Sequence, residues 1–365
     1  MTNPLVTVNL GSNRPGGIDI VLAGLSRQTF QDFEVIFVDG RYHQRHQRVL
    51  EAVKASGLRQ PFYHVPNHRF KDDIWGSTCA GYNTGFALSA GEIVVMLLDY
   101  GYCPPTWLEE HVKHQKEPKV VMAPHEYRSP RRLAQVTETP GPFLDFMIAR
   151  DDQPADMHGG HERYNVDLHD PLVSIETILQ QRRRFDEISV FDKPFTPEML
   201  EDFPIEASEI KCMMGTGPSN YRYFNTKNES FPTDAVLSIN GMDENYDRGR
   251  GPGDPDIGFR LERYGLPQWV VHEALVHCIN PRRILPNLNL VAPEAGHLPP
   301  PHDQRWSYLD GCAYFDRVVA EGTLVARNPF DIREMRKHLW HWRELSQEPE
   351  TAIDRHVVSD AEYFK

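Results

Sequence analysis

The chain has few cysteines, a deficit of basic residues and no long apolar run, and each shortage excludes a class of protein. Its five cysteines are scattered through 365 residues, and no two of them form a C-x-x-C pair. This odd, dispersed set argues against a disulfide scaffold or a structural zinc site and favours a reducing compartment. The 39 basic residues against 52 acidic ones give a formal charge of −13, which disfavours nucleic-acid binding over a broad surface.

The apolar runs and the first residues bear on location. No apolar run is long enough to span a bilayer. The first residues lead directly into a β-rich run and a glycine turn, without the basic and apolar regions of a signal peptide. We therefore expect a cytoplasmic protein without a transmembrane segment, either free or peripheral to the membrane.

Short apolar runs alternate with amphipathic stretches through the N-terminal third of the chain. This alternation predicts an α/β fold with a doubly wound, mainly parallel sheet flanked by helices. The last apolar run is almost continuous, which is typical of a strand buried on both faces. Strands are expected at 5–10, 33–38, 62–65 and 92–98, and helices at 18–27, 49–56 and 79–88.

The rest of the chain predicts an insertion and a helical C-terminal extension. Residues 124–210 are rich in proline and charged residues, and a proline-rich stretch at 298–301 follows the second ordered region. We expect one domain over 1–284, divided into a nucleotide-binding half (1–123), an insertion (124–210) and an acceptor and base half (211–284). The helical extension covers 285–365, and helices are expected at 173–185 and 332–345.

Polar segments follow three of the expected strands, at 11–17, 39–40 and 99–101. In open α/β sheets ligands bind beyond the carboxyl ends of the strands. Asp99 comes directly after the buried strand, where a carboxylate can hold Mg²⁺ or Mn²⁺ that bridges a diphosphate. A turn-capping role before Pro104 is an equally good reading of Asp99.

A second candidate carboxylate, Asp254, follows a glycine-rich loop. Pro255 suits the first position of a helix that ends at Gly265, so Asp254 is predicted to cap that helix. The helix dipole keeps such a carboxylate ionised, and an ionised carboxylate at a crevice can accept a proton from an acceptor hydroxyl. Asp256 has a simpler reading as a first-turn acid paired with Arg260 four residues later.

An apolar run at 269–277 reads as a strand that ends in His277. Imidazole can complete a manganese site begun by a carboxylate. A partly buried histidine with an ordinary hydrogen-bond partner is the more common case.

These segments, in this order, resemble the family 2 glycosyltransferases of the GT-A fold over roughly 4–125 and 212–280. Each motif alone is weak, but their order and spacing are fairly specific. The matching segments are 28–40 (Q-T-x-x-x-x-E-[IV]-I-x-V-D-[DG]), 81–85 (A-R-N-x-G), 90–92 (A-x-G-E), 240–244 (G-G-F-D-E) and 253–256 (E-D-x-D).

The resemblance implies that a sugar passes with inversion from a nucleotide-sugar, most often UDP-linked in this family, to a hydroxyl acceptor. The acceptor is a growing polysaccharide, a lipid-linked saccharide, a protein or a small molecule. Asp254 is the implied base, Asp99 the implied first Asp of a D-x-D motif that binds Mn²⁺ or Mg²⁺ with the diphosphate, and His277 a further metal ligand. The remaining implied site residues are Gly11, Ser12, Arg14, Asp39 and Asn83 for the nucleotide, with Asp39 on its base, and Asp243, Glu244 and Asp256 on the acceptor side.

The sequence also departs from the family pattern. Gly101 replaces the second Asp of D-x-D, Tyr82 replaces the Arg of A-R-N-x-G, and Gly253 replaces the Glu before the base. Metal binding would then rest on Asp99, His277 and the phosphates. These changes keep open a non-catalytic nucleotide- or carbohydrate-binding protein.

A sugar-phosphate nucleotidyltransferase is the other alternative. It is disfavoured because Arg14 is the only basic residue of the loop at 11–17. The basic stretches at 41–48 and 182–184 read as a solvated helix face and a helix end, and Arg248 and Arg250 as part of a solvated loop.

Overall fold

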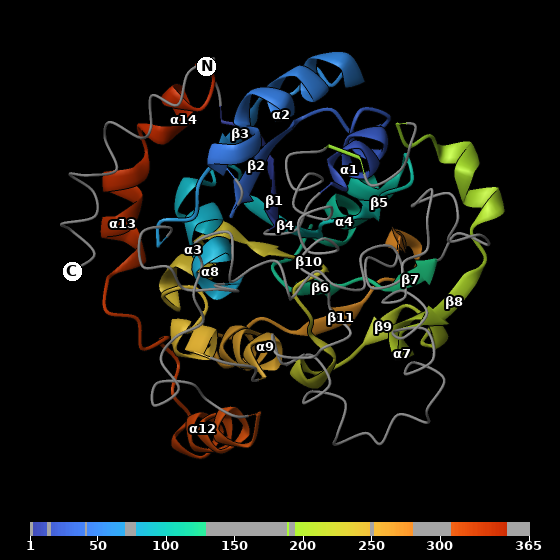
Figure 1. The fold of residues 1–365 in the computed structure, drawn as a ribbon. Coiled ribbons are helices and arrows are strands. Elements are labelled where there is room, and N and C mark those ends of the chain that lie inside the picture. Colours follow the sequence, from blue (N-terminus) through green and yellow to red (C-terminus); the bar gives the residue numbers. More distant parts are fainter. Residues whose placement is uncertain are drawn as a thin grey trace, which may run out of the picture.

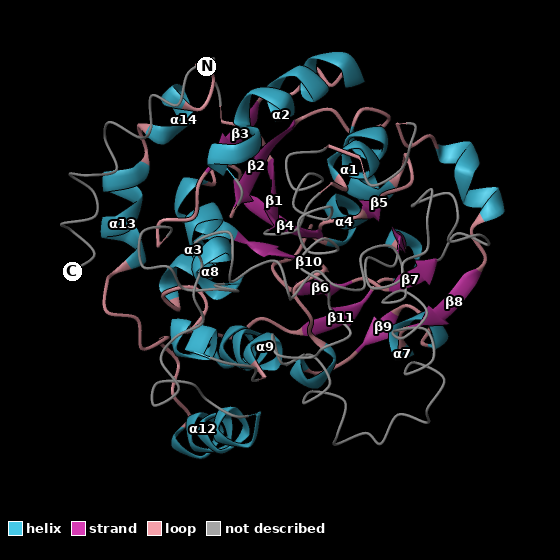
Figure 2. Ribbon diagram, in the orientation of Figure 1, coloured by secondary structure: helices cyan, strands magenta, loops and turns pink. Residues whose placement is uncertain are grey.

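The computed structural model describes residues 3–12, 16–40, 42–69, 78–128, 188–189, 194–248, 252–279 and 308–348. It confirms the predicted fold class: a large central sheet is flanked by helices, and the C-terminal region is helical (Figures 1 and 2). Several predictions lie outside the described residues, namely Arg14, the helix at 173–185, the basic stretch at 182–184, Arg250 and the proline-rich stretch at 298–301.

The central sheet has eight strands in the order β3-β2-β1-β4-β10-β6-β11-β9 (Figure 1). The four strands of the N-terminal half are parallel, and β10 enters antiparallel between β4 and β6. Every residue of β4 is buried, as its continuous apolar sequence predicts. The strands are β1 (Val6–Ser12), β2 (Phe33–Asp39), β3 (Phe62–Val65), β4 (Ile93–Leu98), β6 (Val120–Met122), β9 (Gly217–Pro218), β10 (Asn228–Pro232) and β11 (Gln268–Val270).

A second sheet of four short strands, in the order β5-β12-β7-β8, adjoins the central one. Its strands are β5 (Gly101–Tyr102), β7 (His125–Arg128), β8 (Ile205–Ser208) and β12 (Val276–Ile279). The predicted single strand over 269–277 is therefore wrong. The chain passes from β6 to β7 around Pro124, and the segment that runs parallel to it passes from β11 to β12 at the same level. Two backbone hydrogen bonds join the segments there: Val271 N donates to Met122 O, and Val276 N donates to Pro124 O, each at 3.1 Å.

Helices cover both faces of the central sheet (Figure 2). Helix α3 is buried almost along its whole length, because it lies between the sheet and the C-terminal helices. The α-helices are α1 (Ile18–Leu25), α2 (Tyr42–Ser56), α3 (Thr78–Leu88), α4 (Trp107–His114), α7 (Ile210–Met213), α8 (Thr233–Ser238), α9 (Gly253–Arg263), α12 (Tyr308–Glu321), α13 (Ile332–Leu339) and α14 (Trp342–Leu345). Short 3-10 turns lie at Pro197–Asp202, Tyr221–Tyr223, Glu244–Arg248 and His272–Ala274.

The C-terminal helices share the core of the sheet domain. The helix predicted over 332–345 is divided into α13 and α14, and α13 buries Ile332, Met335 and Leu339 against α3. Their spacing of three and four residues places them on one face of the helix. Arg343 forms an ion pair with Glu34 of β2, which joins the C-terminal region to the N-terminal half. The extension thus belongs to the hydrophobic core that supports the site.

Candidate active site

The structure brings together three predicted site residues at the carboxyl ends of β1, β2 and β4. Ser12 is aligned with Asp39 in the parallel register, and Gly11 is aligned with Leu98, the residue before Asp99. The Ser12 hydroxyl donates a hydrogen bond to Asp99 Oδ2 at 2.8 Å. The side chain of Asp99 is thereby fixed at the edge of the sheet where ligands bind in this architecture.

Asp39 is buried between two partners. The Arg45 guanidinium donates to both carboxylate oxygens at 2.6 and 2.8 Å, and His64 Nε2 donates to Oδ2 at 2.9 Å. Burial alone raises the pKa of Asp39, but Arg45 and His64 outweigh it and hold that pKa well below its usual range. The solvated-face prediction for 41–48 is wrong for Arg45 and His46, which are buried because Arg45 neutralises Asp39, whereas His43, Gln47 and Arg48 are exposed. A nucleotide base that binds Asp39 would therefore share its carboxylate with Arg45 and His64.

The position of the second D-x-D aspartate is crowded. A Cβ at Gly101 would lie 3.0 Å from the carbonyl oxygen of Leu98 and 3.2 Å from Val276, so a larger side chain would require these neighbours to shift. Tyr100 before it has a φ of 61°, and its ring packs against Gly17, whose own φ is 81°. This packing brings the β1–α1 loop against the turn that carries Asp99.

Asp254 lies in the first turn of α9, on the other side of the site. The predicted capping role is wrong: the helix begins at Gly253 with Pro252 at the capping position, and Pro255 is its third residue. The carboxylate instead accepts a hydrogen bond from Thr226 Oγ1 at 2.9 Å. Burial raises the pKa of Asp254, whereas Lys227 and the Thr226 hydrogen bond oppose that rise.

Tyr82, at the position of the arginine in A-R-N-x-G, contacts both Thr226 and the end of β1. Its hydroxyl donates to the backbone carbonyl of Thr226, and a Cβ at Gly11 would lie 3.8 Å from its ring. Burial raises the pKa of Tyr82, and the neighbouring carboxylates Asp254 and Asp99 raise it further. Asp99 and Asp254 therefore both lie within electrostatic reach of one buried phenol.

Asn83 and Glu244 stabilise the loop after α8. Asn83 Nδ2 donates to Met242 O and to Glu244 Oε1, both at 2.9 Å, and its Oδ1 accepts from Met242 N at 2.8 Å. Glu244 also contacts His68 Nε2 and Arg69 Nη1, each at 3.3 Å. These contacts place both residues in a structural network that connects α3 to the loop.

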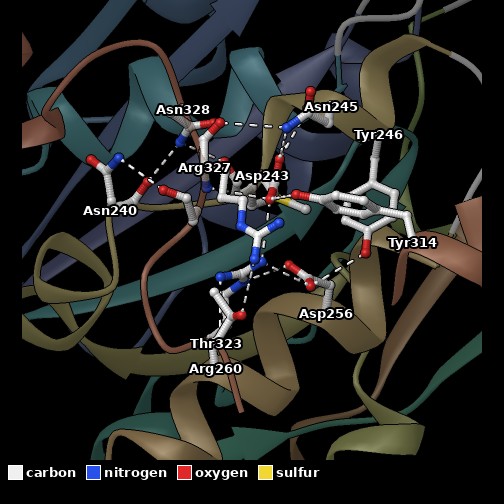
Figure 3. A network of polar contacts seen from close by, with 12 residues as sticks. Asn240, Asp243, Asn245, Tyr246, Asp256, Arg260, Tyr314, Thr323, Arg327 and Asn328 are labelled. Carbon is white, nitrogen blue, oxygen red and sulfur yellow. Dashed lines mark hydrogen bonds and ion pairs between the residues drawn. The ribbon is translucent and has the colours of Figure 1, made fainter. Parts of the chain in front are cut away.

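Asp243 and Asp256 both form ion pairs with one buried arginine of α9, Arg260 (Figure 3). Arg260 contacts Asp256 at 2.7 Å, as the spacing of four residues predicts, and Asp243 at 3.2 Å. Tyr314 of α12 donates to Asp243 at 2.7 Å. Burial raises the pKa of Asp256 to about 6 although Arg260 opposes it. The structure thus places both carboxylates in the core, where they connect α9 to the C-terminal region.

His277 lies in the second sheet. Its Nδ1 accepts a hydrogen bond from Arg128 Nε at 3.2 Å and is 3.3 Å from Glu126 Oε2, and its ring stacks on Tyr102. Burial and Arg128 lower the pKa of His277. In the described parts of the chain, no group of three His, Cys, Asp or Glu side chains is arranged to hold a metal ion.

A comparison with protein families matches the sequence of this same region. Residues 12–168 match the model of glycosyl transferase family 2, a segment that contains Asp39, Asn83 and Asp99. The matched segment, which is less than half of the chain, is similar to that family. A comparison with curated protein sequences produced no match.

A comparison with solved structures finds two that are similar to this chain. A crystal structure of Staphylococcus aureus TarS, residues 1–349, has a TM-score of 0.44 at 10% identity and covers 95% of this chain and 72% of that one. A second TarS structure has a TM-score of 0.42 at 10% identity, covering all of this chain and 55% of that one.

Two features of the candidate site were missed at the level of sequence. Lys227 is one feature: it lowers the pKa of Asp254, and Asp254 in turn raises the pKa of Lys227. Asp247 accepts hydrogen bonds from the backbone N–H groups of Cys79 and Ala80, each at 2.9 Å, and so stabilises the start of α3 from 167 residues away along the chain. Neither residue belongs to a recognisable motif, so no local signal could have identified them.

Proposed function

We propose that this domain transfers a sugar from a nucleoside-diphosphate donor, UDP-linked by preference, to a hydroxyl acceptor with inversion at the anomeric carbon. The observation that supports it is that Asp99 and Asp254 both lie within electrostatic reach of Tyr82, whose hydroxyl donates to the carbonyl of Thr226. Asp99 lies at the edge of the sheet where a diphosphate is expected. Asp254 lies on the acceptor side.

The chemistry needs one base and one leaving group. The acceptor oxygen attacks the anomeric carbon, its proton passes to the carboxylate of Asp254, and the carbon–oxygen bond to the diphosphate breaks with its electron pair on the phosphate. A single carboxylate base suffices here, unlike the carboxylate pair of glycosidases. Burial raises the pKa of Asp254, which makes the ionised group a stronger proton acceptor.

The side chains near Asp99 fit a metal that is shared with the substrate. One carboxylate and the Ser12 hydroxyl lie together, and Gly101 supplies no second carboxylate. Mg²⁺ and Mn²⁺ accept such sparse protein ligation when substrate phosphates and water complete the shell. When bound, the ion would neutralise charge on the diphosphate. His277 as a further ligand stays a prediction.

The acceptor is proposed only by class. We propose a saccharide, a lipid-linked saccharide or a protein hydroxyl, in the setting of polysaccharide biosynthesis at the cytoplasmic side. In the parts of the chain that the structure describes, no helix is both long and apolar enough to cross a membrane.

Calorimetry tests the donor site directly. The protein is titrated with UDP, GDP, CDP and dTDP, with and without Mn²⁺, beside Asp99→Ala and the control Asp316→Ala on the exposed face of α12. We expect one nucleotide to bind selectively, Mn²⁺ to tighten it, and Asp99→Ala alone to remove the effect of Mn²⁺. If none binds at millimolar concentration in either condition, the proposal is wrong.

A further inference from the structure

The dipeptide Thr226–Lys227 joins the two sides of the proposed site. Leu98 N donates to the carbonyl of Lys227 at 2.9 Å, which places Lys227 beside the end of β4, next to Asp99. On the other side, Thr226 is hydrogen-bonded to Asp254 at 2.9 Å. The backbone of Lys227 is thus placed between the end of β4 and the threonine that binds Asp254.

The ammonium of Lys227 has spare capacity to bind an anion. Among the described residues only the Tyr127 hydroxyl, at 3.1 Å, lies within hydrogen-bonding distance, and the nearest ion-pair partner, Glu209, is 4.0 Å away. About a third of the side chain, 34%, is exposed. The neighbouring Lys211 is the opposite case, because it is 2% exposed and contacts Glu229 at 2.7 Å. Lys211 is a structural cation, whereas Lys227 has one hydrogen-bond partner among the described residues and three donors.

The surroundings keep Lys227 charged. Burial lowers the pKa of the ammonium, but Tyr127, Glu209 and Asp254 outweigh it and raise that pKa. The charged groups around Asp254 are Lys227 and Lys211, which lower its pKa, and Glu209, which raises it. Lys227 is therefore a cation at neutral pH.

We propose that Lys227 binds the diphosphate of the donor and stabilises the negative charge that develops on it when the bond to the sugar breaks. This inference rests on the function proposed above. The electron pair of the broken bond stays on the phosphate oxygen, and the ammonium keeps its proton while it donates hydrogen bonds to that oxygen. A fixed cation suits this site because Gly101 does not supply the second carboxylate of a D-x-D metal site.

The experiment compares nucleoside diphosphates with nucleosides. Wild type, Lys227→Met, Lys227→Arg and the control Lys113→Met, on the surface of α4, are titrated with UDP, GDP, CDP and dTDP and with the matching nucleosides in Mn²⁺. A charge-assisted hydrogen bond predicts that Lys227→Met weakens the diphosphate at least about tenfold. Nucleoside affinity should stay constant, Lys227→Arg should retain most diphosphate binding, and Lys113→Met should match wild type.

Each other outcome has one meaning. If the wild type binds a diphosphate and Lys227→Met binds it equally well, the role of Lys227 is overturned and the donor site stands. If diphosphate and nucleoside affinities fall together, the substitution deforms the site, and a direct contact with the phosphates is again overturned. If the wild type binds no nucleoside diphosphate, the proposed function fails and the role of Lys227 fails with it.

Discussion

Helix α9 carries two aspartates, two positions apart, in opposite environments. Asp254 is only partly buried, with a hydroxyl of Thr226 as its hydrogen-bond partner and the ammonium of Lys227 nearby. Asp256 is fully buried and contacts Arg260 and the Tyr246 hydroxyl (Figure 3). The difference shows two roles for a carboxylate. A carboxylate that reacts must be accessible to the substrate, whereas a buried carboxylate that stabilises the fold needs hydrogen-bond and ion-pair partners for its oxygens. The predictions below test this division.

Loss of the Asp254 carboxylate should have the largest effect on activity. Asp254→Asn keeps the size of the side chain and removes the proton acceptor, so transfer should fall by about 10²–10⁴-fold. Thermal unfolding should change little, because the residue is only partly buried and the amide can still accept the Thr226 hydrogen bond. Initial rates with a nucleotide-sugar donor, together with a melting curve, measure both. A variant that transfers at the wild-type rate would remove Asp254 as the base.

Arg260→Met should have the largest effect on stability. It leaves Asp243 and Asp256 buried without their shared cation, which costs about 3–5 kcal/mol of unfolding free energy. Denaturant unfolding measures this cost. The control is the triple variant Arg260→Met, Asp243→Asn, Asp256→Asn, which removes the stranded charges and should recover part of the loss. If Arg260→Met is as stable as wild type, the network of Figure 3 does not stabilise the fold.

These two regions also differ in how far the sequence could predict them. The alternating apolar runs predicted the sheet and its flanking helices, because strand and helix periodicities are local. The Asp256–Arg260 pair was predicted for the same reason and is confirmed. The rest of the network was not, because Tyr314 is 71 residues from Asp243 and its contact exists only in the folded chain.

The candidate site shows the same limit. The carboxyl ends of the strands located Ser12, Asp39 and Asp99, and the structure brings them to one edge. Arg45, which forms an ion pair with Asp39, was predicted to lie on a solvated helix face, because the sequence of a basic stretch does not indicate a buried partner. Lys227 stands alone before a strand, so only its position beside Asp254 shows its importance.

Tyr314→Phe should have a moderate effect, limited to the stability of the network around Asp243 and Asp256. It removes one donor to Asp243, whose Oδ2 keeps Arg260, so about 1–2 kcal/mol of unfolding free energy should be lost. The rate of transfer below the melting temperature should stay near that of wild type. The exposed substitution Asp316→Asn on the same helix serves as control. A large loss of activity in the folded Tyr314→Phe variant would show that the two faces of α9 are coupled.

Thr226→Val should have the smallest effect, and it should appear as a shift of the pH profile. The base works when ionised, so activity is present above the pKa of Asp254 and is lost as the pH falls through it. The Thr226 hydrogen bond lowers that pKa, so its removal raises the pKa and moves the acid limb of kcat/KM to higher pH. Rates at pH 8 should stay close to wild type, and Thr226→Ser should restore the original limb because it keeps the hydroxyl. An unchanged limb in Thr226→Val would mean that the titrating group is not Asp254, because no other described carboxylate accepts this hydroxyl.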